Sequence, residues 1–263
     1  MPSLILGRRH LAVLASFAAS NVLIALDYDG TLAPIAPTPE AARMRPRTRH
    51  LLAHVSKLYP CVVISGRSLE DLTRRLRRIP VWHLVGDHGF QEEGGSLQAA
   101  AHVRDWVERL QQQLPVVPGL IIEPKPNTVT VHYRQVSDKQ DVLAAIESAV
   151  LELPDARAVN GAEAVNLLPR GGPDKGTALT HARRVFACDT AIYLGDDGTD
   201  EDAFRSAGPD RLLSIRIGTD GESAARYRLE SQMDIDHFLD TLLKLRASYD
   251  ASTGNATSRR LTN

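Results

Sequence analysis

Two carboxylates follow an apolar run near the beginning of the chain. Asp27 and Asp29 lie in the segment Asp-Tyr-Asp-Gly-Thr, directly after the run Val22–Leu26. Carboxylates at the end of a buried strand can hold a divalent cation and leave one oxygen free to attack phosphorus. Because Asp and Gly are also common turn formers, this pair alone is equally compatible with an ordinary turn.

A second polar segment, Ser65-Gly66-Arg67, follows the apolar run Cys61–Ile64. A serine hydroxyl and the backbone N–H groups that a glycine leaves exposed can surround a phosphate, and the N-terminus of the next helix adds positive potential. The same residues could instead form a turn before a helix that Ser68 caps. The segment alone therefore leaves both interpretations open.

A lysine and a group of acids complete the candidate chemistry. Lys175 precedes a helical pattern, where it can neutralise a carboxylate and a phosphate oxygen together, although a solvated loop lysine also fits. Asp196 and Asp197 follow the apolar run Ala191–Leu194, and adjacent carboxylates repel each other unless a cation intervenes. The preference for acids in the first turn of a helix accounts for Asp200. Oxygen ligands without His or Cys favour Mg²⁺ over Zn²⁺.

The elements that must position these residues alternate between strand and helix patterns. This alternation indicates a parallel sheet with helices on both faces. Because ligands bind beyond the carboxyl ends of such strands, we expect Asp27, Ser65 and Asp196 to lie at one edge of the sheet. The predicted core strands are 22–26, 61–64, 82–85, 191–194 and 212–217, and the predicted core helices are 47–58, 68–79, 176–186, 200–207 and 235–245.

The alternation changes in the middle of the chain. After Gly94-Gly95 the pattern predicts a helix, two strands joined by a Pro-bounded turn, a second helix, and a hairpin around Asn160-Gly161. We therefore expect an α+β domain inserted into a Rossmann-like α/β core. The predicted boundaries are an N-terminal helix over 1–20, a core formed by 21–94 and 166–247, an insert over 95–165, and a disordered tail over 248–263.

Composition narrows the classes of partner and compartment. The 263 residues are 43% hydrophobic, and 31 basic against 32 acidic residues give a net charge of −1. Neither this charge nor the hydropathy pattern indicates a nucleic-acid or membrane partner. Cys61 and Cys188 lie in apolar surroundings at unrelated spacing, which predicts unpaired thiols in a reducing, cytoplasmic compartment. A monomer is compatible with the sequence, although no pattern decides the oligomeric state.

The apolar N-terminus allows two interpretations. Its short apolar run with Arg8-Arg9 could belong to a secretory signal. A packed helix is the expected arrangement, because Arg8 and His10 interrupt the start of the run and cleavage near Ser20 would adjoin the first core strand.

In this order, the four polar segments resemble the haloacid dehalogenase-like phosphatase superfamily. The shared pattern is Asp-x-Asp-Gly-Thr, a strand-terminal serine, a lysine, and Gly-Asp-Asp followed by a further aspartate. The resemblance implies that Asp27 is the nucleophile that forms an aspartyl-phosphate, and that Asp29 is the general acid and then the base. Ser65 and Lys175 would hold the phosphoryl group. The implied Mg²⁺ ligands are Asp27, the main-chain carbonyl of Asp29, and Asp196, with Asp200 supporting them from outside.

The insert lies where a subset of that superfamily carries a cap over the active site, and its motifs resemble trehalose-6-phosphate phosphatases. This resemblance implies an Mg²⁺-dependent sugar phosphatase that releases trehalose and phosphate. The matching segments are Leu26–Ile35, Ile64–Arg67, Gly86–Gly89, Val131–Arg134 and Gly195–Phe204. The expected substrate contacts are Gly66, Arg67, His88, Lys125 and Asn166.

One position departs from the family pattern. The cap hairpin of the family usually ends in a glutamate, and Asn166 stands there in this chain. A carboxylate accepts two sugar hydroxyls strongly, whereas an amide accepts more weakly and also donates. Another disaccharide or glycosyl phosphate therefore stays open as the substrate. His132 and Arg134 alternate on one strand and could face the cleft, although we expect a solvated face there.

Three other classes of protein fit parts of the pattern. Receiver domains also combine an Asp cluster, Ser or Thr, Lys and Mg²⁺, but they are about half this length and lack the insert. A catalytically silent regulatory partner of a sugar-phosphate synthase would share the fold, but all four motifs are intact here. A phosphomutase would share the chemistry and differ in its products. The sequence therefore favours a sugar phosphatase.

Overall fold

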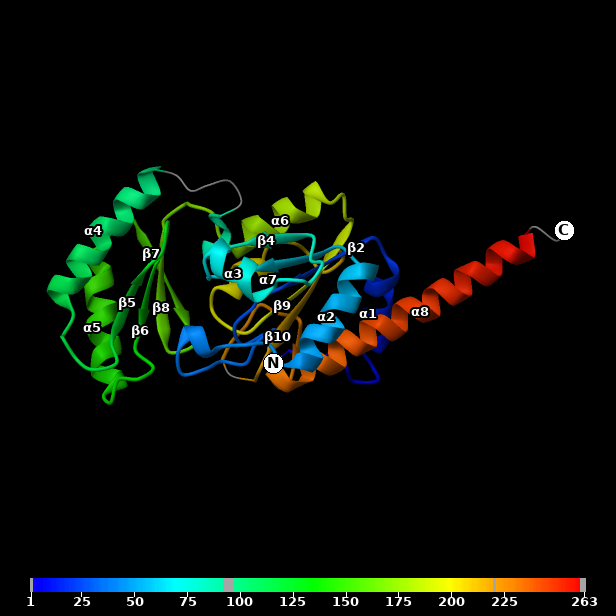
Figure 1. The fold of residues 1–263 in the computed structure, drawn as a ribbon, viewed down its shortest axis with the longest axis horizontal. Coiled ribbons are helices and arrows are strands. Elements are labelled where there is room, and N and C mark those ends of the chain that lie inside the picture. Colours follow the sequence, from blue (N-terminus) through cyan, green and yellow to red (C-terminus); the bar gives the residue numbers. More distant parts are fainter. Residues whose placement is uncertain (1, 92–96, 220, 261–263) are drawn as a thin grey trace.

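Two sheets organise the chain in the computed structural model, which describes residues 2–91, 97–219 and 221–260. The core contains a seven-stranded sheet, and the insert, called the cap below, contains a four-stranded sheet. In Figure 1 the cap, with its sheet and two helices, lies to the left of the core. The predicted fold class, a parallel α/β core with an inserted α+β domain, is confirmed.

The core sheet is parallel, in the order β1-β11-β10-β9-β2-β3-β4. Because β2 pairs with both β9 and β3, the loops that follow these three strands meet at one edge of the sheet. The strands are β1 (Ser3–Leu4), β2 (Val22–Leu26), β3 (Cys61–Ile64), β4 (His83–Val85), β9 (Thr190–Gly195), β10 (Leu212–Ile217) and β11 (Tyr227–Leu229).

Side chains on the core strands alternate between two apolar layers. On β2, Ile24 and Leu26 pack with the layer of α1, α2, α3 and α8, whereas Leu23 and Ala25 pack with α6 and α7. Burial on both faces explains why the strand is apolar throughout. The core helices are α1 (Leu11–Ala19), α2 (Pro46–Leu58), α3 (Leu69–Arg75), α6 (Lys175–Val185), α7 (Asp200–Phe204) and α8 (Ile235–Arg260), with 3₁₀ turns η1 (Pro39–Ala41), η2 (Asp87–Gly89) and η3 (Gln232–Asp234).

The cap is an antiparallel sheet, in the order β5-β6-β8-β7, with two helices on one face. Val129 and Val131 of β6 pack against Trp106 of α4 and Ile146 of α5, whereas Thr130 between them faces the opposite side, toward the core. This alternation leaves a polar cap face above the core strand ends. The elements are α4 (Leu97–Gln113), β5 (Ile121–Pro124), β6 (Val129–His132), α5 (Lys139–Leu151), β7 (Ala156–Gly161) and β8 (Ala164–Pro169).

The domain boundaries differ from the prediction at both ends of the core. β8 continues to Pro169 within the cap sheet, so the second core segment begins after that residue and not at 166. The N-terminus is not helical throughout 1–20, because Ser3–Leu4 pairs with β11 and only Leu11–Ala19 forms α1. The two short strands β1 and β11 escaped prediction. The predicted start of the insert at 95 lies outside the described residues.

The closing helix is longer than predicted. α8 runs to Arg260 and projects beyond the core (Figure 1), where the sequence predicts a helix to 245 and a disordered tail from 248. The extension contains no proline, and ion pairs one helical turn apart join Lys244 to Asp240 and Arg246 to Asp250. The guanidinium of Arg246 also lies over the ring of Tyr59. These contacts extend the helix past Leu242, which is its last buried residue up to position 252.

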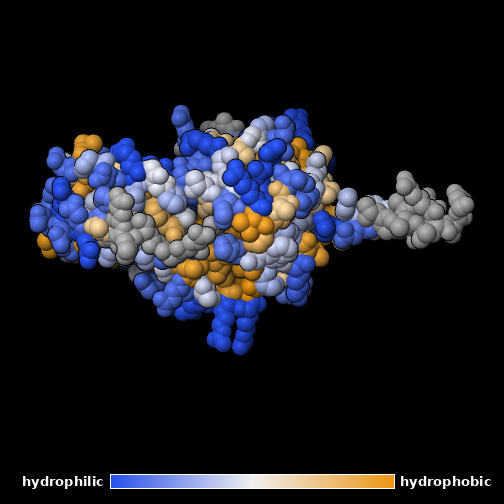
Figure 2. All heavy atoms as spheres, turned by 90° about the horizontal axis from the view of Figure 1, so that it is seen from above, coloured by the Kyte–Doolittle hydropathy of each residue, from blue (hydrophilic) through white to orange (hydrophobic). Residues whose placement is uncertain are grey.

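The polarity of the surface and the state of the two cysteines agree with what the composition predicts. In the face shown in Figure 2, hydrophilic residues predominate and apolar residues form small patches. Of the helices in the described ranges, each is too short or too polar to cross a lipid bilayer. Cys61 and Cys188 are free and buried, as predicted, and burial raises the pKa of Cys61 to about 12.

Candidate active site

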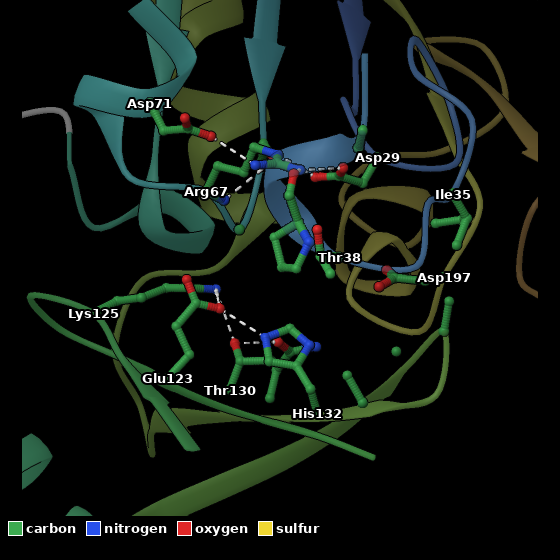
Figure 3. Close-up of a pocket in the computed structure, with 18 of the residues that line it drawn as sticks. Asp29, Ile35, Thr38, Arg67, Asp71, Glu123, Lys125, Thr130, His132 and Asp197 are labelled. Atoms are coloured by element: carbon green, nitrogen blue, oxygen red, sulfur yellow. Dashed lines mark hydrogen bonds and ion pairs between the residues drawn. The ribbon is translucent and has the colours of Figure 1, made fainter. Parts of the chain in front are cut away.

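A cleft of about 430 Å³ lies between the carboxyl ends of the core strands and the polar face of the cap. In Figure 3, Asp29 and Arg67 lie on its core side, opposite Glu123, Lys125 and His132 of the cap. The loops after β2, β3 and β9, together with the start of α6, bring the core residues together. The lining includes Asp27, Ser65, Lys175 and Asp196, of which Asp27 and Lys175 are 148 residues apart in the sequence.

 Folding of the parallel sheet therefore brings together side chains that are far apart in the sequence.

Lys175 connects two carboxylates at the buried end of the cleft. Its ammonium group donates to Asp27 Oδ1 over 2.9 Å and to Asp200 Oδ1 over 2.8 Å, and all three side chains are almost fully buried. The lysine is the first residue of α6, whose N-cap Asp174 accepts from the backbone N–H of Thr177. Lys175 is therefore an inward-facing cation and not the solvated loop residue that was the alternative.

Asp200 is held by donors on both oxygens. The Tyr193 hydroxyl donates to Oδ1, and the backbone N–H groups of Asp196 and Asp197 donate to Oδ2 over 2.9 and 3.0 Å. With Lys175, these bonds occupy the carboxylate fully, so it orients the loop after β9 more than it offers a free ligand atom. This geometry agrees with a supporting position outside the direct metal ligands.

Three carboxylates could hold a cation. Oxygen atoms of Asp27, Asp196 and Asp200 lie within 4.8 Å of one another. A Cβ on Gly30 would lie 1.9 Å from Asp196 Oδ2, so only glycine, with its φ of +74°, allows this carboxylate to approach the loop after β2. Closely spaced carboxylate oxygens, those of Asp27 and Asp200 on buried side chains and those of Asp196 on a partly buried one, fit Mg²⁺, which prefers hard oxygen ligands.

The acids of this group titrate under mutual repulsion and burial. Burial raises the pKa of Asp27 and of Asp196 well above the ordinary value, and neighbouring aspartates add to the shift. Burial likewise raises the pKa of Asp197 to about 6. Burial alone would also raise the pKa of Asp200, but Lys175 and the hydroxyl of Tyr193 hold it below its ordinary value. A divalent cation among these groups would favour their charged forms.

Asp29 is engaged by an arginine. Both of its carboxylate oxygens accept from Arg67, over 2.6 Å from Nε and 2.7 Å from Nη2. Arg67 also donates to Asp71 and to the carbonyl of Pro39, each over 2.6 Å. Four hydrogen bonds therefore fix the guanidinium, and its predicted contact with substrate stays a prediction.

His88 lies directly against the loop 65–67, which is called the phosphate-binding loop below after its predicted role. A Cβ on Gly66 would come within 2.4 Å of its imidazole ring, so the glycine makes room for the histidine. The Ser65 hydroxyl accepts from the backbone N–H of Arg67 over 3.3 Å. The His88 side chain is 3% exposed, and neither ring nitrogen makes a hydrogen bond to the described residues. Burial, reinforced by Lys125 and Lys175, lowers its pKa well below the ordinary value, so the ring is neutral.

The cap presents a connected polar surface to the cleft. Lys125 Nζ donates to Thr130 Oγ1 over 2.8 Å, and that hydroxyl donates to Asn166 Oδ1 over 2.9 Å. His132 Nε2 lies 2.7 Å from Glu123 Oε2. Lys125, which could have been a solvated turn residue, is therefore largely covered and lies beside Asn166 in the cleft wall.

Sequence reasoning missed part of this surface. Glu123 received no role, and a solvated face was expected for His132 and Arg134, all of which line the cleft. The available signal was the alternation of polar residues on both strands: Glu123 lies opposite Thr130 in the antiparallel pair. Asp197, which also lines the cleft, stood in the acidic motif without a role of its own.

Comparisons with known proteins agree with this geometry. A sequence model of the family described as trehalose-phosphatase matches residues 25–233. Trehalose-phosphate phosphatases of Mycobacterium tuberculosis and Mycolicibacterium paratuberculosis are 31% and 34% identical to the chain over 252 and 246 residues. These alignments cover 89% and 86% of this chain but 64% and 63% of the relatives, so the chain spans less than two thirds of their length.

Solved structures show the same fold. The C-terminal domain of the Candida albicans trehalose-6-phosphate phosphatase aligns with a TM-score of 0.76 at 23% identity, covering 94% of this chain and 98% of that one. A trehalose-6-phosphate phosphatase related protein aligns with a TM-score of 0.64 at 25% identity, covering 86% and 99%. The shared fold therefore includes both the core and the cap.

Proposed function

The chain belongs to the trehalose-phosphatase family, and from this premise we propose that it is a phosphoric monoester hydrolase that releases trehalose and phosphate from trehalose 6-phosphate. The observation that carries the proposal is the buried bridge of Lys175 between Asp27 and Asp200, beside Asp196 and beneath the polar cap face. This arrangement combines a carboxylate nucleophile with positive charge for a phosphoryl group.

The reaction would proceed in two displacements. Asp27 attacks phosphorus, an oxygen–phosphorus bond forms, and the bond from phosphorus to the sugar oxygen breaks while Asp29 gives that oxygen a proton. Asp29 then takes a proton from water, whose oxygen attacks the aspartyl-phosphate, and inorganic phosphate leaves as Asp27 is restored. For these proton transfers the carboxyl group of Asp29 must separate from Arg67.

Mg²⁺ would be held by Asp27, the main-chain carbonyl of Asp29, and Asp196, with Asp200 as their support. When bound, it would neutralise negative charge that develops on the phosphoryl oxygens. Lys175 and the Ser65 loop would hold the same oxygens from the protein side. Lys125, His88 and Asn166 would then contact the sugar from the cap and the cleft wall.

The test is phosphate release from a panel of sugar phosphates with Mg²⁺. We expect trehalose 6-phosphate to be hydrolysed faster than glucose 6-phosphate, and removal of divalent cations by a chelator to abolish the activity until Mg²⁺ is restored. Asp27→Asn, which keeps the shape but removes the nucleophile, should lower kcat by at least about a thousandfold. Equal rates for the two sugars would contradict the substrate, and an active Asp27→Asn variant would contradict the mechanism.

Asn166 favours a second candidate, the phosphate ester of another disaccharide or a glycosyl phosphate. Its amide, hydrogen-bonded to Thr130, replaces the usual family carboxylate on the cap. The same substrate panel tests this candidate directly. For location we propose the cytoplasm, which the two unpaired, buried thiols support.

A further inference from the structure

Asp87 joins the core to the cap through a buried carboxylate. It lies in η2, after β4, with its side chain fully removed from solvent. Its Oδ2 accepts from the backbone N–H of Asn127 over 2.7 Å and from Asn127 Nδ2 over 3.0 Å, and its Oδ1 accepts from the Thr128 hydroxyl. Three donors from one cap turn therefore compensate the burial of this carboxylate.

Other polar contacts between cap and core are more exposed. Arg157 of β7 pairs with Asp202 of α7 through side chains that are 35% and 21% exposed. Arg134 and Gln135 donate to backbone carbonyls of the loop that precedes η1. Of the hydrogen bonds described between the two domains, those of Asp87 use the most deeply buried side chain, so they are the least open to replacement by water.

The core side of this contact is fixed to the phosphate-binding loop. Asp87 and His88 both have left-handed backbone conformations, with φ of +50° and +59°. Such conformations are unfavourable for residues other than glycine and persist where surrounding bonds determine them. Here the N–H of Asp87 donates to the carbonyl of Arg67 over 2.7 Å, and the N–H of His88 donates to that of Ser65 over 3.0 Å.

The cap side of the contact carries Lys125. The N–H of Lys125 donates to the carbonyl of Thr128 over 2.8 Å, which closes the turn that Asp87 holds. From this turn the lysine side chain reaches Thr130, and through that hydroxyl it is connected to Asn166. A displacement of the turn relative to the core would therefore displace the lysine relative to Ser65 and His88.

We propose that Asp87 is a positioning residue that fixes the cap turn 124–128, and with it Lys125, above the phosphate-binding loop. The proposal rests on the proposed function in one respect, namely that the sugar of the substrate meets Lys125 while its phosphate meets the core. Asp87 itself touches no substrate atom in this scheme. It sets the separation between the two parts of the site that must engage one molecule together.

The test compares two phosphate esters on Asp87→Asn in the full chain. Asparagine keeps the shape of aspartate, but its NH₂ group would replace an oxygen that accepts hydrogen bonds from Asn127 or Thr128, so donor would face donor. We expect the KM for trehalose 6-phosphate to rise about tenfold to a hundredfold, while kcat/KM for p-nitrophenyl phosphate, which carries no sugar, changes less than about threefold. Asp236→Asn is the matched control, because it alters a carboxylate that accepts from Thr48 entirely within the core.

A second variant guards against a folding defect. Thr128→Val removes one donor from the cap side, and we expect the same separation of the two esters in milder form. Both changes break the same contact between Asp87 and the cap turn. The KM of the double variant for trehalose 6-phosphate should therefore be no higher than that of Asp87→Asn alone. Equal losses on both esters, or additive effects, would overturn the positioning role.

Amide hydrogen exchange at Asn127 separates this proposal from the proposed function. It should be slow in the wild type and faster in Asp87→Asn, whatever the substrate is. Slow exchange in a protein that does not hydrolyse trehalose 6-phosphate would reject the substrate while supporting the contact. Unprotected exchange of the Asn127 amide in an active wild type would overturn the role of Asp87.

Discussion

At the scale of single residues, the buried positive charge of Lys175 in the cleft is balanced by the carboxylates of Asp27 and Asp200. An ammonium group as buried as that of Lys175 would lose its proton without compensation, but Asp200 and Asp27 outweigh the effect of burial and raise its pKa well above the ordinary value. The lysine therefore remains a cation at all physiological pH. Neutral His88 next to it has no such partner, so the two residues respond differently to acid.

His88 makes the fold sensitive to acid. In the unfolded chain it gains a proton near pH 6.5, whereas burial, with Lys125 and Lys175 nearby, keeps it neutral in the folded protein. As pH falls below about 6.5, the unfolded state is therefore favoured by up to about 1.4 kcal/mol per pH unit, until the depressed folded pKa is reached. His88→Asn, which tolerates the left-handed backbone, should lose less stability over this range.

Denaturant unfolding of both proteins at about pH 7.5 and about pH 5 measures this difference. The aspartates whose pKa is raised act in the opposite direction, but they are present in both proteins and cancel in the comparison. Equal pH dependence for the wild type and His88→Asn would show that the imidazole titrates freely in the folded state.

Under the proposed function, the residue at position 166 determines how strongly the cap accepts sugar hydroxyls. A glutamate there would place a carboxylate beside Thr130 and Lys125, and hydrogen bonds to charged groups are stronger than those to neutral ones. We expect Asn166→Glu to lower the KM for trehalose 6-phosphate about tenfold. Asn166→Gln, of the same length without the charge, is the control. An unchanged KM in the glutamate variant would remove position 166 from the sugar site.

At the scale of elements, long and doubly buried segments were predictable, and short or exposed ones were not. The predicted strands 22–26, 61–64 and 212–217 match the structure residue for residue. In the first two, burial on both faces leaves a continuous apolar run, and in the third Ser214 and Arg216 interrupt a run that is otherwise apolar. Ser68 caps α3 as predicted, by accepting from the N–H of Asp71. By contrast, β11 has three residues and carries no such run.

The candidate site was predictable where several motifs converge on one sheet edge, and less so where pairing between distant strands places a side chain. Strand order follows from tertiary contacts, so the sequence did not show that Glu123 and His132 would face each other. Likewise, Asp87 stands in a short Gly-bounded loop, and only the folded cap turn reveals what its carboxylate does. Local patterns carry no information about such contacts.

The exposed end of α8 should contribute little to the core. Residues 248–252 are exposed, and Leu242 is the last fully buried residue of the helix up to position 252. We expect truncation after Ala247 to change the free energy of unfolding by less than about 1 kcal/mol and to leave phosphatase activity intact. As a control, Leu242→Ala in the full chain should cost about 2–5 kcal/mol. Chemical denaturation measures both, and a comparable loss on truncation would show that the projecting helix packs on the molecule.

At the scale of the whole molecule, the proposed function requires the substrate to be enclosed between two domains, whose described polar contacts differ in burial. In the proposed function, the core supplies the phosphoryl chemistry, the cap supplies the sugar contacts, and both act in the cleft of about 430 Å³ between them. Asp87 provides a buried contact, and Arg157 provides a partly exposed one to Asp202. The two contacts should therefore differ in what they contribute to stability and to substrate binding.

Arg157→Gln tests the partly exposed contact between Arg157 and Asp202. Because exposed ion pairs contribute about 0–1 kcal/mol, we expect the melting temperature to fall by no more than about 4 °C. The cap would nevertheless be held less firmly over the core, so the KM for trehalose 6-phosphate should rise about threefold to tenfold, with p-nitrophenyl phosphate hydrolysis nearly unchanged.

Added salt should weaken sugar-phosphate binding in the wild type more than in the variant, since screening acts on the same ion pair. Asp202→Asn, which alters the other partner, should reproduce the result. A large loss of melting temperature with an unchanged KM would mean that this pair supports the fold and not the enclosure of the substrate.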